Sequence, residues 1–288
     1  MSEGKIISGK EVSAELRASV KTRVDAFAEQ AKTTPHLAVV LASDDPASAT
    51  YVRFKGRAAE QCNIRSTQHT ISAETSAEEL LKLVQQLNDD EDVDGILVQL
   101  PLPKQHDEKS ILQAIDPAKD VDGFHPLNSG LLARGDESGL MPCTPSGIIK
   151  LIESTGEQIS GKSAVVLGRS SIVGRPIAEM LLNRSATVTI CHSRTKNLPE
   201  VVRQSDIVIA AIGRPFFVKG SWIKPGATVI DVGINRTEDG KLVGDVAYHS
   251  AIERAGAITP VPGGVGPMTI ACLMENTLIA AKNRRGIQ

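Results

Sequence analysis

The spacing of apolar residues predicts alternating helices and strands in the first half of the chain. Apolar residues recur every three or four positions over residues 10–31 and 76–87, which is typical of helices with one buried face. Short, mainly apolar runs at residues 37–41 and 95–100 are typical of buried strands, and residues 64–70 form a third candidate. This alternation indicates a parallel sheet with right-handed crossovers.

Weaker signals complete this half. Ser48 is the expected N-cap of a helix that runs to about Cys62, and residues 110–115 predict a short helix. Residues 116–145 are rich in glycine and proline, which is typical of a connection between domains.

The second half repeats the alternation with stronger signals. Apolar runs predict four strands, at residues 163–167, 187–191, 206–211 and 227–232. Helices are predicted over about 146–154, up to Leu182 after a glycine-rich turn, and over 267–282. A series of this kind is typical of a doubly wound parallel sheet.

The composition is that of an ordinary globular protein. Hydrophobic residues make up 41% of the chain, which allows a core of useful size. The formal net charge of −2 and the aromatic content of 3% argue against a nucleic-acid or membrane partner. The four cysteines show no CxxC spacing, so no metal site is expected. The N-terminus has no apolar signal segment, and we therefore expect a cytoplasmic protein.

A glycine-rich turn after the strand at 163–167 predicts a dinucleotide-binding site. Its spacing, Gly168-x-Ser170-x-x-x-Gly174, is a variant of GxGxxG. Gly168 would allow a tight turn, and Gly174 would allow the helix to pack closely on the strand. Backbone N–H groups and the positive end of the helix attract a pyrophosphate at such a turn. A purely structural turn between strand and helix is the alternative.

The end of the next strand bears on the choice between NADP and NAD. An acidic residue there usually binds the ribose 2′-hydroxyl of NAD, whereas a basic residue accommodates the 2′-phosphate of NADP. The chain reads Cys191-His-Ser-Arg-Thr195, without an acidic residue. Arg169 and Arg194 can each pair with a phosphate, which favours NADP. Both arginines could instead be solvated surface residues.

Polar residues in the first half form a second candidate site. Tyr51 and Lys55 are four positions apart on a predicted helix, so they share a face. A tyrosine can stack on a flat heterocycle, and a lysine can handle protons. Gln99 ends a strand, where ligands of open α/β sheets collect, and Asp120 and Asp122 lie in the glycine-rich segment. A surface pair, a loop hydrogen bond and turn residues are the simpler explanations.

A third feature is the segment Pro260-Val-Pro-Gly-Gly-Val-Gly-Pro-Met-Thr269. It is too rich in glycine for core packing, and it precedes a predicted helix. Its N–H groups could face a ligand, although an ordinary loop with a helix cap would look the same.

Six stretches of the chain closely resemble one family, the bifunctional methylenetetrahydrofolate dehydrogenase/methenyltetrahydrofolate cyclohydrolase enzymes. They are Tyr51-Val-x-x-Lys55, Gly95-Ile-Leu-Val-Gln-Leu-Pro-Leu-Pro103, Lys119-Asp-Val-Asp-Gly-Phe-His-Pro126, Pro142-Cys-Thr-Pro145, Gly168-Arg-Ser-Ser-Ile-Val-Gly-Arg-Pro176 and Pro260-Val-Pro-Gly-Gly-Val-Gly-Pro-Met-Thr269. Each stretch alone has limited specificity, but six in the family's order are very specific. The resemblance extends over essentially the whole chain.

The resemblance implies one folate site for two consecutive reactions. A hydride passes from 5,10-methylenetetrahydrofolate to NADP, and water then converts 5,10-methenyltetrahydrofolate to 10-formyltetrahydrofolate. Lys55 would handle the proton in the hydrolysis, and Gln99 would hold Lys55 in position. Tyr51 would stack on the folate rings, and Asp122 would bind the pterin amino edge. The other implied contacts are Pro262 and Gly263 for the substrate and Gly168, Arg169, Ser170, Gly174, Ser193, Arg194, Ile234 and Thr269 for the cofactor.

The resemblance also implies a fold of two α/β domains with the active-site cleft between them, the second domain being a Rossmann-like doubly wound parallel sheet. Residues 1–141 with 267–288 would bind folate, residues 142–266 would bind NADP, and the chain would form a homodimer. Three alternatives compete with this interpretation. A shikimate-type hydroxy-acid dehydrogenase would not require the first-half polar residues, a monofunctional methylenetetrahydrofolate dehydrogenase would not require Lys55, and a nucleotide-sensing module would require only the cofactor turn.

Overall fold

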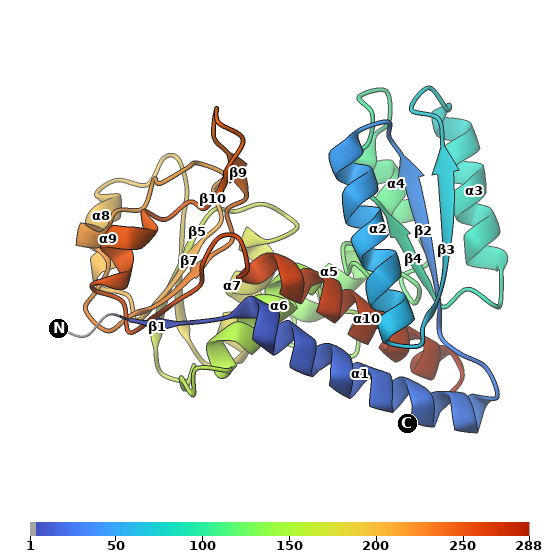
Figure 1. Ribbon diagram of the computed structural model, residues 1–288, viewed down its shortest axis with the longest axis horizontal. Coiled ribbons are helices and arrows are strands. Elements are labelled where there is room, and N and C mark those ends of the chain that lie inside the picture. The colour runs from blue at the N-terminus through green and yellow to red at the C-terminus, as the bar shows by residue number, and fades with distance from the viewer. Residues whose placement is uncertain (1–3, 288) are drawn as a thin grey trace. The chain divides into compact units, whose positions relative to one another are not determined.

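The computed structural model describes residues 4–287, which form two compact units (Figure 1). The large-sheet unit consists of the chain up to Ser13 together with Thr144–Thr269. The small-sheet unit consists of Ala14–Cys143 and the chain from Ile270 onward. Each unit alternates strands and helices around a parallel sheet, which confirms the two-part α/β fold.

The large-sheet unit contains a six-stranded sheet in which all neighbouring strands are parallel, in the order β1-β11-β8-β7-β5-β6. Its strands are β1 (Lys5–Ile6), β5 (Ser163–Leu167), β6 (Thr187–Cys191), β7 (Ile207–Ala210), β8 (Thr228–Asp231) and β11 (Ala257–Ile258). Strands β6 and β7 lie on opposite sides of β5, so the sheet is doubly wound with its switch point at β5. The four strands predicted in this half are confirmed to within one residue at each end.

Several short elements of this unit carried no usable sequence pattern. The longest of its helices are α6 (Cys143–Glu153) and α7 (Gly174–Asn183), which the apolar periodicity predicted. The shorter elements are α8 (Leu198–Arg203), the 3-10 helix η1 (Gly220–Trp222), α9 (Tyr248–Ile252) and the hairpin of β9 (Asn235–Arg236) with β10 (Leu242–Val243). Elements of two to six residues are too short to show a recognisable pattern of apolar and polar positions.

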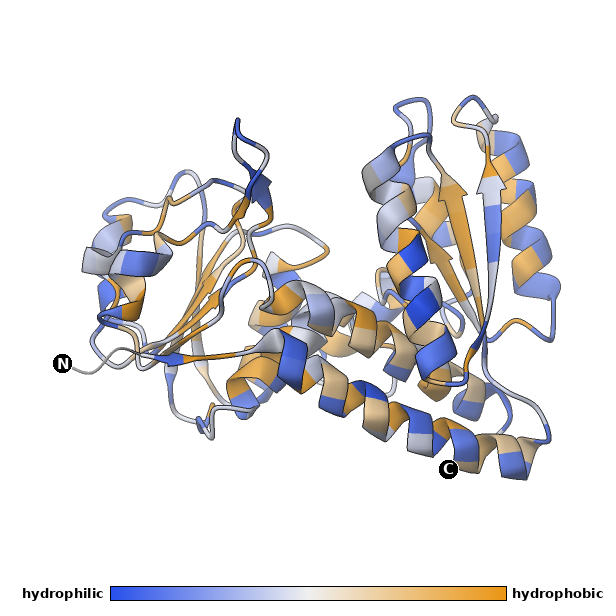
Figure 2. Cartoon of the chain, in the orientation of Figure 1, coloured by the Kyte–Doolittle hydropathy of each residue, from blue (hydrophilic) through white to orange (hydrophobic). Residues whose placement is uncertain are grey.

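The small-sheet unit is built around β2 (His36–Ala42), which lies between β3 (Arg65–Ile71) and β4 (Gly95–Val98) in a parallel sheet. Successive β2 side chains point to opposite faces. One set, including Leu37 and Leu41, packs in the core with α1 (Gly9–Ala31) and α10 (Val265–Arg284), and the other packs with α3 (Ala77–Asp89). Figure 2 shows β2 and β4 as apolar strands, which fits a sheet buried on both faces.

The remaining helices of this unit are α2 (Pro46–Gln61), α4 (Glu108–Ala114) and α5 (Pro126–Ala133). The helix predicted over residues 76–87 is confirmed as α3 to within two residues, and Ser76 and Glu79 form a capping box at its N-terminus.

The predicted N-cap of α2 is wrong. Helix α2 already begins at Pro46, so Ser48 lies in its first turn. The Asp45 carboxylate accepts hydrogen bonds from the backbone N–H of Ser48 at 2.9 Å and from its hydroxyl at 3.0 Å. Asp45 therefore performs the capping, and Pro46 occupies the first helical position, where its missing N–H costs little.

The glycine- and proline-rich segment 116–145 is more than a connection between domains. It contains α5, whose first residue is Pro126, and Lys119, Asp120 and Val121 are almost fully buried. Composition misled the prediction because proline also starts helices and glycine also follows them.

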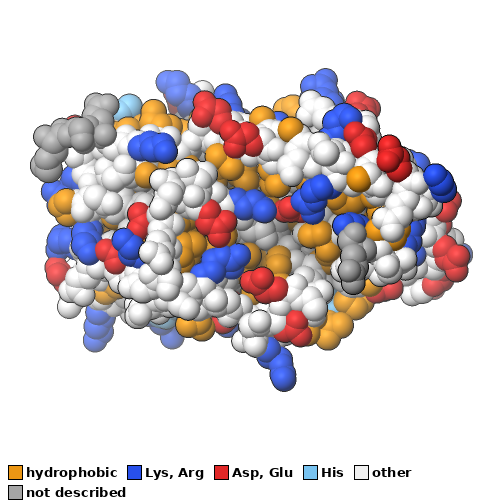
Figure 3. Space-filling model, turned by 90° about the horizontal axis from the view of Figure 1, so that it is seen from below, with side chains coloured by type: hydrophobic (Ala, Val, Ile, Leu, Met, Phe, Trp, Pro, Cys, Tyr) orange, Lys and Arg blue, Asp and Glu red, His pale blue; other side chains and the backbone are white. Residues whose placement is uncertain are grey.

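Acidic and basic side chains are interspersed on the face of the molecule in Figure 3, in keeping with the formal net charge of −2. Within residues 4–287, no helix is long and apolar enough to cross a membrane.

Candidate functional site

The turn from β5 into α7 requires glycine at both of its ends. Gly168 has a φ of +119°, and a Cβ there would collide with the carbonyl oxygen of Ala211. A Cβ at Gly174 would lie 2.5 Å from the carbonyl oxygen of Gly168. The expected tight turn is confirmed. Gly174 packs closely against the backbone of the turn at Gly168 and Arg169.

Ser170, within the turn, accepts hydrogen bonds from backbone N–H groups at the start of α7. Its hydroxyl accepts hydrogen bonds from the N–H groups of Val173 and Gly174, both at 3.2 Å. Its carbonyl accepts a hydrogen bond from the N–H of Arg175 at 3.0 Å. The hydroxyl therefore shapes the turn, which is a role that needs no ligand.

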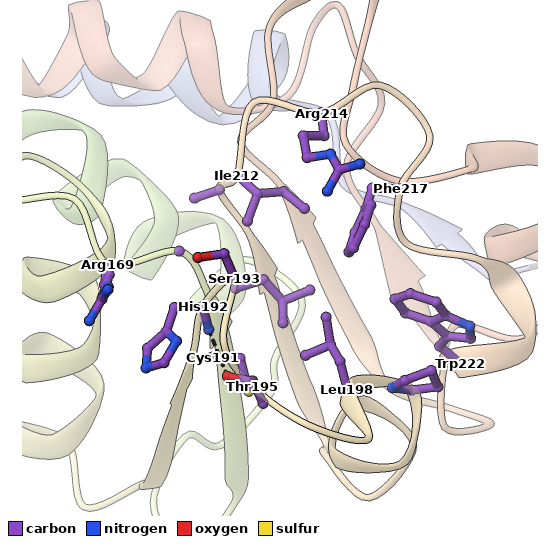
Figure 4. Close-up of a pocket in the computed structure, with 14 residues that line it drawn as sticks. Arg169, Cys191, His192, Ser193, Thr195, Leu198, Ile212, Arg214, Phe217 and Trp222 are labelled. Atoms are coloured by element: carbon purple, nitrogen blue, oxygen red, sulfur yellow. Dashed lines mark hydrogen bonds between the residues drawn. The ribbon is translucent and has the colours of Figure 1, made fainter.

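A pocket of about 660 Å³ opens beside this turn, at the carboxyl ends of β5, β6 and β7. Gly168, Arg169 and Ser193 line it together with an apolar wall that includes Phe217 and Trp222 (Figure 4). The two aromatic rings meet edge to face with their centroids 5.6 Å apart. The volume is typical of small-molecule sites, and doubly wound sheets bind ligands at this edge.

The charged residues of the pocket are basic. Arg169 and Arg214 contribute to the lining, and none of the described lining residues is acidic. The Arg214 guanidinium lies over the Phe217 ring, 4.6 Å from its centroid. Arg194 is exposed, and its backbone N–H donates to Nδ1 of His192 at 3.2 Å. Arg169, rather than Arg194, therefore faces the pocket.

In the part of the chain that the structure describes, five expected cofactor residues lie outside this lining, namely Ser170, Gly174, Arg194, Ile234 and Thr269. Ile234 follows β8 and is 55% exposed. The hydroxyl of Thr269 lies 2.9 Å from that of Thr144. Pro262 is exposed, and Gly263 adopts a φ of +104°. The ligand contacts of these residues stay predictions.

Lys55 and Gln99 are joined in the small-sheet unit. Nζ of Lys55, on α2, donates to Oε1 of Gln99 at 2.9 Å. Gln99 directly follows β4, its N–H donates to the carbonyl of Val40 at 2.9 Å, and its Nε2 donates to the carbonyl of Leu100 at 2.6 Å. Both the oxygen and the nitrogen of the Gln99 side-chain amide are hydrogen-bonded, so the amide holds the ammonium group of Lys55 in one position. Lys55 is only 8% exposed.

Asp122 belongs to the same group of side chains. Burial raises the pKa of Asp122 to about 6, the positive charge of Lys55 opposes this shift, and the negative charge of Asp120 adds to it. Asp122 can therefore gain or lose a proton near neutral pH. Lys55, Gln99 and Asp122 come from three separate segments, and the fold brings them together.

Tyr51 lies one turn before Lys55 on α2, with 41% of its surface exposed. Phe54, which the sequence did not single out, is 45% exposed on the same helix. The exposed ring of Tyr51 is available for stacking.

The segment that carries Asp122 is anchored by two residues whose role the sequence did not reveal. Nζ of Lys119 donates to three backbone carbonyls at the end of α3, at 2.7 to 3.1 Å. Nδ2 of Asn276, on α10, donates to the carbonyl of Val121 at 2.8 Å. Lysine and asparagine are usually exposed, so only the position of Lys119 within the Lys-Asp-Val-Asp stretch could have drawn attention to it.

Two family models match the chain and together cover most of it. "Tetrahydrofolate dehydrogenase/cyclohydrolase, catalytic domain" matches residues 7–122, and "Tetrahydrofolate dehydrogenase/cyclohydrolase, NAD(P)-binding domain" matches residues 142–285. The chain belongs to the tetrahydrofolate dehydrogenase/cyclohydrolase family. The pocket beside Gly168 lies within the part that matches the NAD(P)-binding model.

Full-length relatives agree with this assignment. The chain is 56% identical over 284 residues to the bifunctional protein FolD of Paramagnetospirillum magneticum, covering 97% of this chain and 96% of that protein. The crystal structure of the bifunctional enzyme FolD from Campylobacter jejuni has a TM-score of 0.95 at 48% identity, covering 97% of this chain and 99% of that one. The Trypanosoma brucei enzyme, solved with NADP cofactor and inhibitor, has a TM-score of 0.94 at 40% identity, covering 98% and 99%.

These findings confirm the function expected from the sequence at the level of the family. The chain is an NADP-dependent enzyme with methylenetetrahydrofolate dehydrogenase and methenyltetrahydrofolate cyclohydrolase activities. The hydroxy-acid dehydrogenase, the monofunctional dehydrogenase and the nucleotide-sensing module are thereby set aside.

Proposed function

We propose that Lys55, Gln99, Asp122 and Tyr51 form the site at which both reactions of the folate substrate take place. The observation that carries this proposal is the hydrogen bond from Lys55 to Gln99, with Asp122 close enough for its pKa to respond to the charge of Lys55. A buried ammonium group on a fixed amide is suited to moving a proton at one defined position.

The oxidation of 5,10-methylenetetrahydrofolate requires placement more than acid–base help. The folate nitrogens stabilise the cation that forms, so the protein contributes proximity and orientation. NADP, when bound, accepts the hydride. Tyr51 stacks on the folate rings, Asp122 accepts hydrogen bonds from the pterin amino edge, and Pro262 and Gly263 make further substrate contacts.

The hydrolysis of 5,10-methenyltetrahydrofolate does require proton handling. A water oxygen forms a bond to the one-carbon centre, the bond from that carbon to N5 breaks, and one proton is released as 10-formyltetrahydrofolate forms. Lys55 handles protons during this hydrolysis, and Gln99 keeps the lysine in place.

The proposed cofactor contacts centre on the glycine turn and the pocket beside it. Gly168, Gly174 and Ser170 shape the turn that receives the pyrophosphate. Arg169 and Ser193 bind the 2′-phosphate, with Arg194 as a more distant positive charge. Ile234 and Thr269 contact the nicotinamide half. Basic lining without an acidic residue, among the pocket residues described, supports NADP over NAD.

The division of labour between the two parts of the chain also belongs to the proposal. Residues 1–141 with 267–288 would bind folate, and residues 142–266 would bind NADP. The described residues before Ser13 pack with the cofactor part, since β1 pairs with β11, so they would support the cofactor sheet rather than the folate site.

We further infer a homodimer that works in the cytoplasm. Strand β6 is an edge of the large sheet, its own Ile190 is 41% exposed, and Leu182 on the neighbouring α7 is 56% exposed. An exposed edge strand with apolar neighbours favours pairing with a second copy. Sedimentation of the purified chain at dimer mass would support this, and monomer mass at micromolar concentration would contradict it.

A spectrophotometric assay tests the proposed function. We expect purified protein given 5,10-methylenetetrahydrofolate and NADP to form reduced nicotinamide, with the methenyl species appearing and then decaying. The same assay with NAD should be slower. Methenyl that accumulates without enzymatic decay would remove the proposed role of Lys55. No reaction with either cofactor, in folded protein, would contradict the folate site itself.

A further inference from the structure

A buried carboxylate, Asp245, organises one wall of the cofactor pocket. The residue is fully buried, and its carboxylate accepts hydrogen bonds from three consecutive backbone N–H groups. Oδ2 accepts from Ile212 at 2.7 Å and Gly213 at 3.0 Å, and Oδ1 accepts from Arg214 at 2.8 Å. Nδ2 of Asn235 donates to Oδ1 as well, at 2.9 Å. One side chain thus determines the direction of three successive peptide groups.

The segment that Asp245 holds forms part of the pocket. Ala211, Ile212 and Arg214 all line it (Figure 4). The carbonyl of Ala211 also lies against Gly168, where a Cβ would collide with it. Movement of residues 211–214 would therefore change both the pocket wall and the packing of the glycine-rich turn at Gly168.

A second carboxylate holds Asp245 in place. Asp231 ends β8, and its Oδ1 accepts a hydrogen bond from the backbone N–H of Asp245 at 2.8 Å. Two glycines make room for the pair: a Cβ at Gly233 would collide with the Asp245 carboxylate, and a Cβ at Gly244 would collide with that of Asp231. Burial raises the pKa of Asp231 to about 6, and the charge of Asp245 adds to this shift. Keeping two buried carboxylates together costs stability, which argues that the arrangement serves the site.

Asp206 offers a comparison within the same sheet. It also binds backbone, since its Oδ2 accepts from the N–H of Ser163 at 3.0 Å, and Lys224 is its salt-bridge partner at 2.6 Å. Asp206 precedes β7, whereas the pocket lies at the opposite end of that strand. Loss of Asp206 should therefore weaken the sheet without reshaping the pocket.

We propose that Asp245 is a positioning residue for NADP, which holds residues 212–214 in the conformation that binds the cofactor. It does not touch the reacting atoms, and the proposal rests on the assignment of the pocket to the cofactor. Its effect should be confined to cofactor affinity, because the folate residues named above lie on other segments of the chain.

The test compares Asp245→Asn with Asp206→Asn in the full-length protein. An asparagine retains the shape but cannot accept from all three N–H groups. We expect Asp245→Asn to raise the Kd of NADP in calorimetry, and its KM, by about tenfold or more, the effect of losing a hydrogen bond to a charged group. Hydrolysis of supplied 5,10-methenyltetrahydrofolate, which needs no cofactor, should stay within about twofold. Asp206→Asn should lower the Tm and leave the Kd of NADP unchanged.

The outcomes separate the possibilities. An unchanged Kd of NADP in folded Asp245→Asn would overturn the proposal, and so would an equal loss of hydrolysis and NADP binding. If Asp245→Asn does not fold, Asn235→Ala removes only one donor to the same carboxylate. We then expect a twofold to fivefold rise in the Kd of NADP, at roughly the low end of hydrogen-bond energies, and no rise would again overturn it. Wild-type protein that binds NADP but processes no folate would contradict the proposed function alone.

Discussion

The two parts of this protein build their sites from different materials. In the large-sheet unit the site depends on backbone: the glycines at both ends of the turn, the Ser170 hydroxyl bound to two N–H groups, and the Asp245 carboxylate bound to three. In the small-sheet unit it depends on side chains that meet from separate segments, namely Lys55, Gln99 and Asp122.

This difference has a physical reason in what each site is proposed to bind. A pyrophosphate is recognised by backbone N–H groups and a helix N-terminus, and these do not depend on particular side chains. The backbone conformation therefore determines whether the site forms, and glycine allows the conformation that is needed. A reaction that moves a proton requires a side chain that can give up or accept one, so the residue type determines whether the site works. A site made of backbone should fail when atoms are added, and a site made of side chains should fail when atoms are removed.

The largest effect should come from removing the amine of Lys55. We expect Lys55→Met to lower cyclohydrolase activity by about 10²- to 10⁴-fold, because proton handling is lost while the apolar stem stays. Most of the dehydrogenase activity should survive, since hydride transfer needs no base. Steady-state assays of both reactions measure this, with the exposed Arg57→Met on the same helix as control. Survival of both activities would show that Lys55 is not the proton-handling residue.

The next effect should come from adding one methyl group at Gly168. An alanine there would be strained at a φ of +119° and would collide with the Ala211 carbonyl. We expect NADP affinity to fall on the order of 100-fold, from strain of about 1–3 kcal/mol and displacement of the turn. Gly161→Ala is the matched control, because its φ is +78° with no atom within 4 Å of the added methyl. Equal NADP affinity in both variants, measured by calorimetry, would contradict a backbone-built site.

A smaller effect is expected where the cofactor site does use a side chain. Arg169→Ala should lower the preference for NADP over NAD by about 10- to 100-fold, the energy of a charge-assisted hydrogen bond to the 2′-phosphate. Arg194→Ala should change this preference less, because Arg194 does not line the pocket. The ratio of kcat/KM for the two cofactors measures both. A larger loss in Arg194→Ala would reverse the two assignments.

The smallest effect should be a pH dependence of folate binding. Below pH 6 the Asp122 carboxyl becomes protonated, because burial raises its pKa to about 6, and it then accepts fewer hydrogen bonds. We expect the KM for folate to rise as the pH falls through this value, by up to about tenfold per pH unit. Asp122→Asn should have a higher KM that no longer responds to pH in this range. A wild-type KM that stays constant between pH 7 and pH 5 would remove the carboxylate from the folate contact.

Sequence reasoning succeeded where the signal was local. The strands β5 and β6 and the helix predicted over residues 76–87 follow from a few neighbouring residues, and the structure confirms their positions to within two residues. It failed at Ser48, because Asp45, three residues earlier, caps the helix instead, and it missed helix α5 and the buried residues within the glycine- and proline-rich segment 116–145.

By itself, the sequence predicted the longer strands and helices, a glycine turn suited to a dinucleotide, and six stretches specific enough to indicate the family. All of these depend on residues close together in the chain. The resemblance already implied that Gln99 holds Lys55, 44 residues away, and the hydrogen bond between them agrees with that expectation. Only the tertiary structure decided that Lys119 and Asn276 anchor the segment of Asp122, and that Asp245 holds three amides of the pocket wall. Burial and hydrogen-bond direction set these contacts, and both arise only once distant segments have packed together.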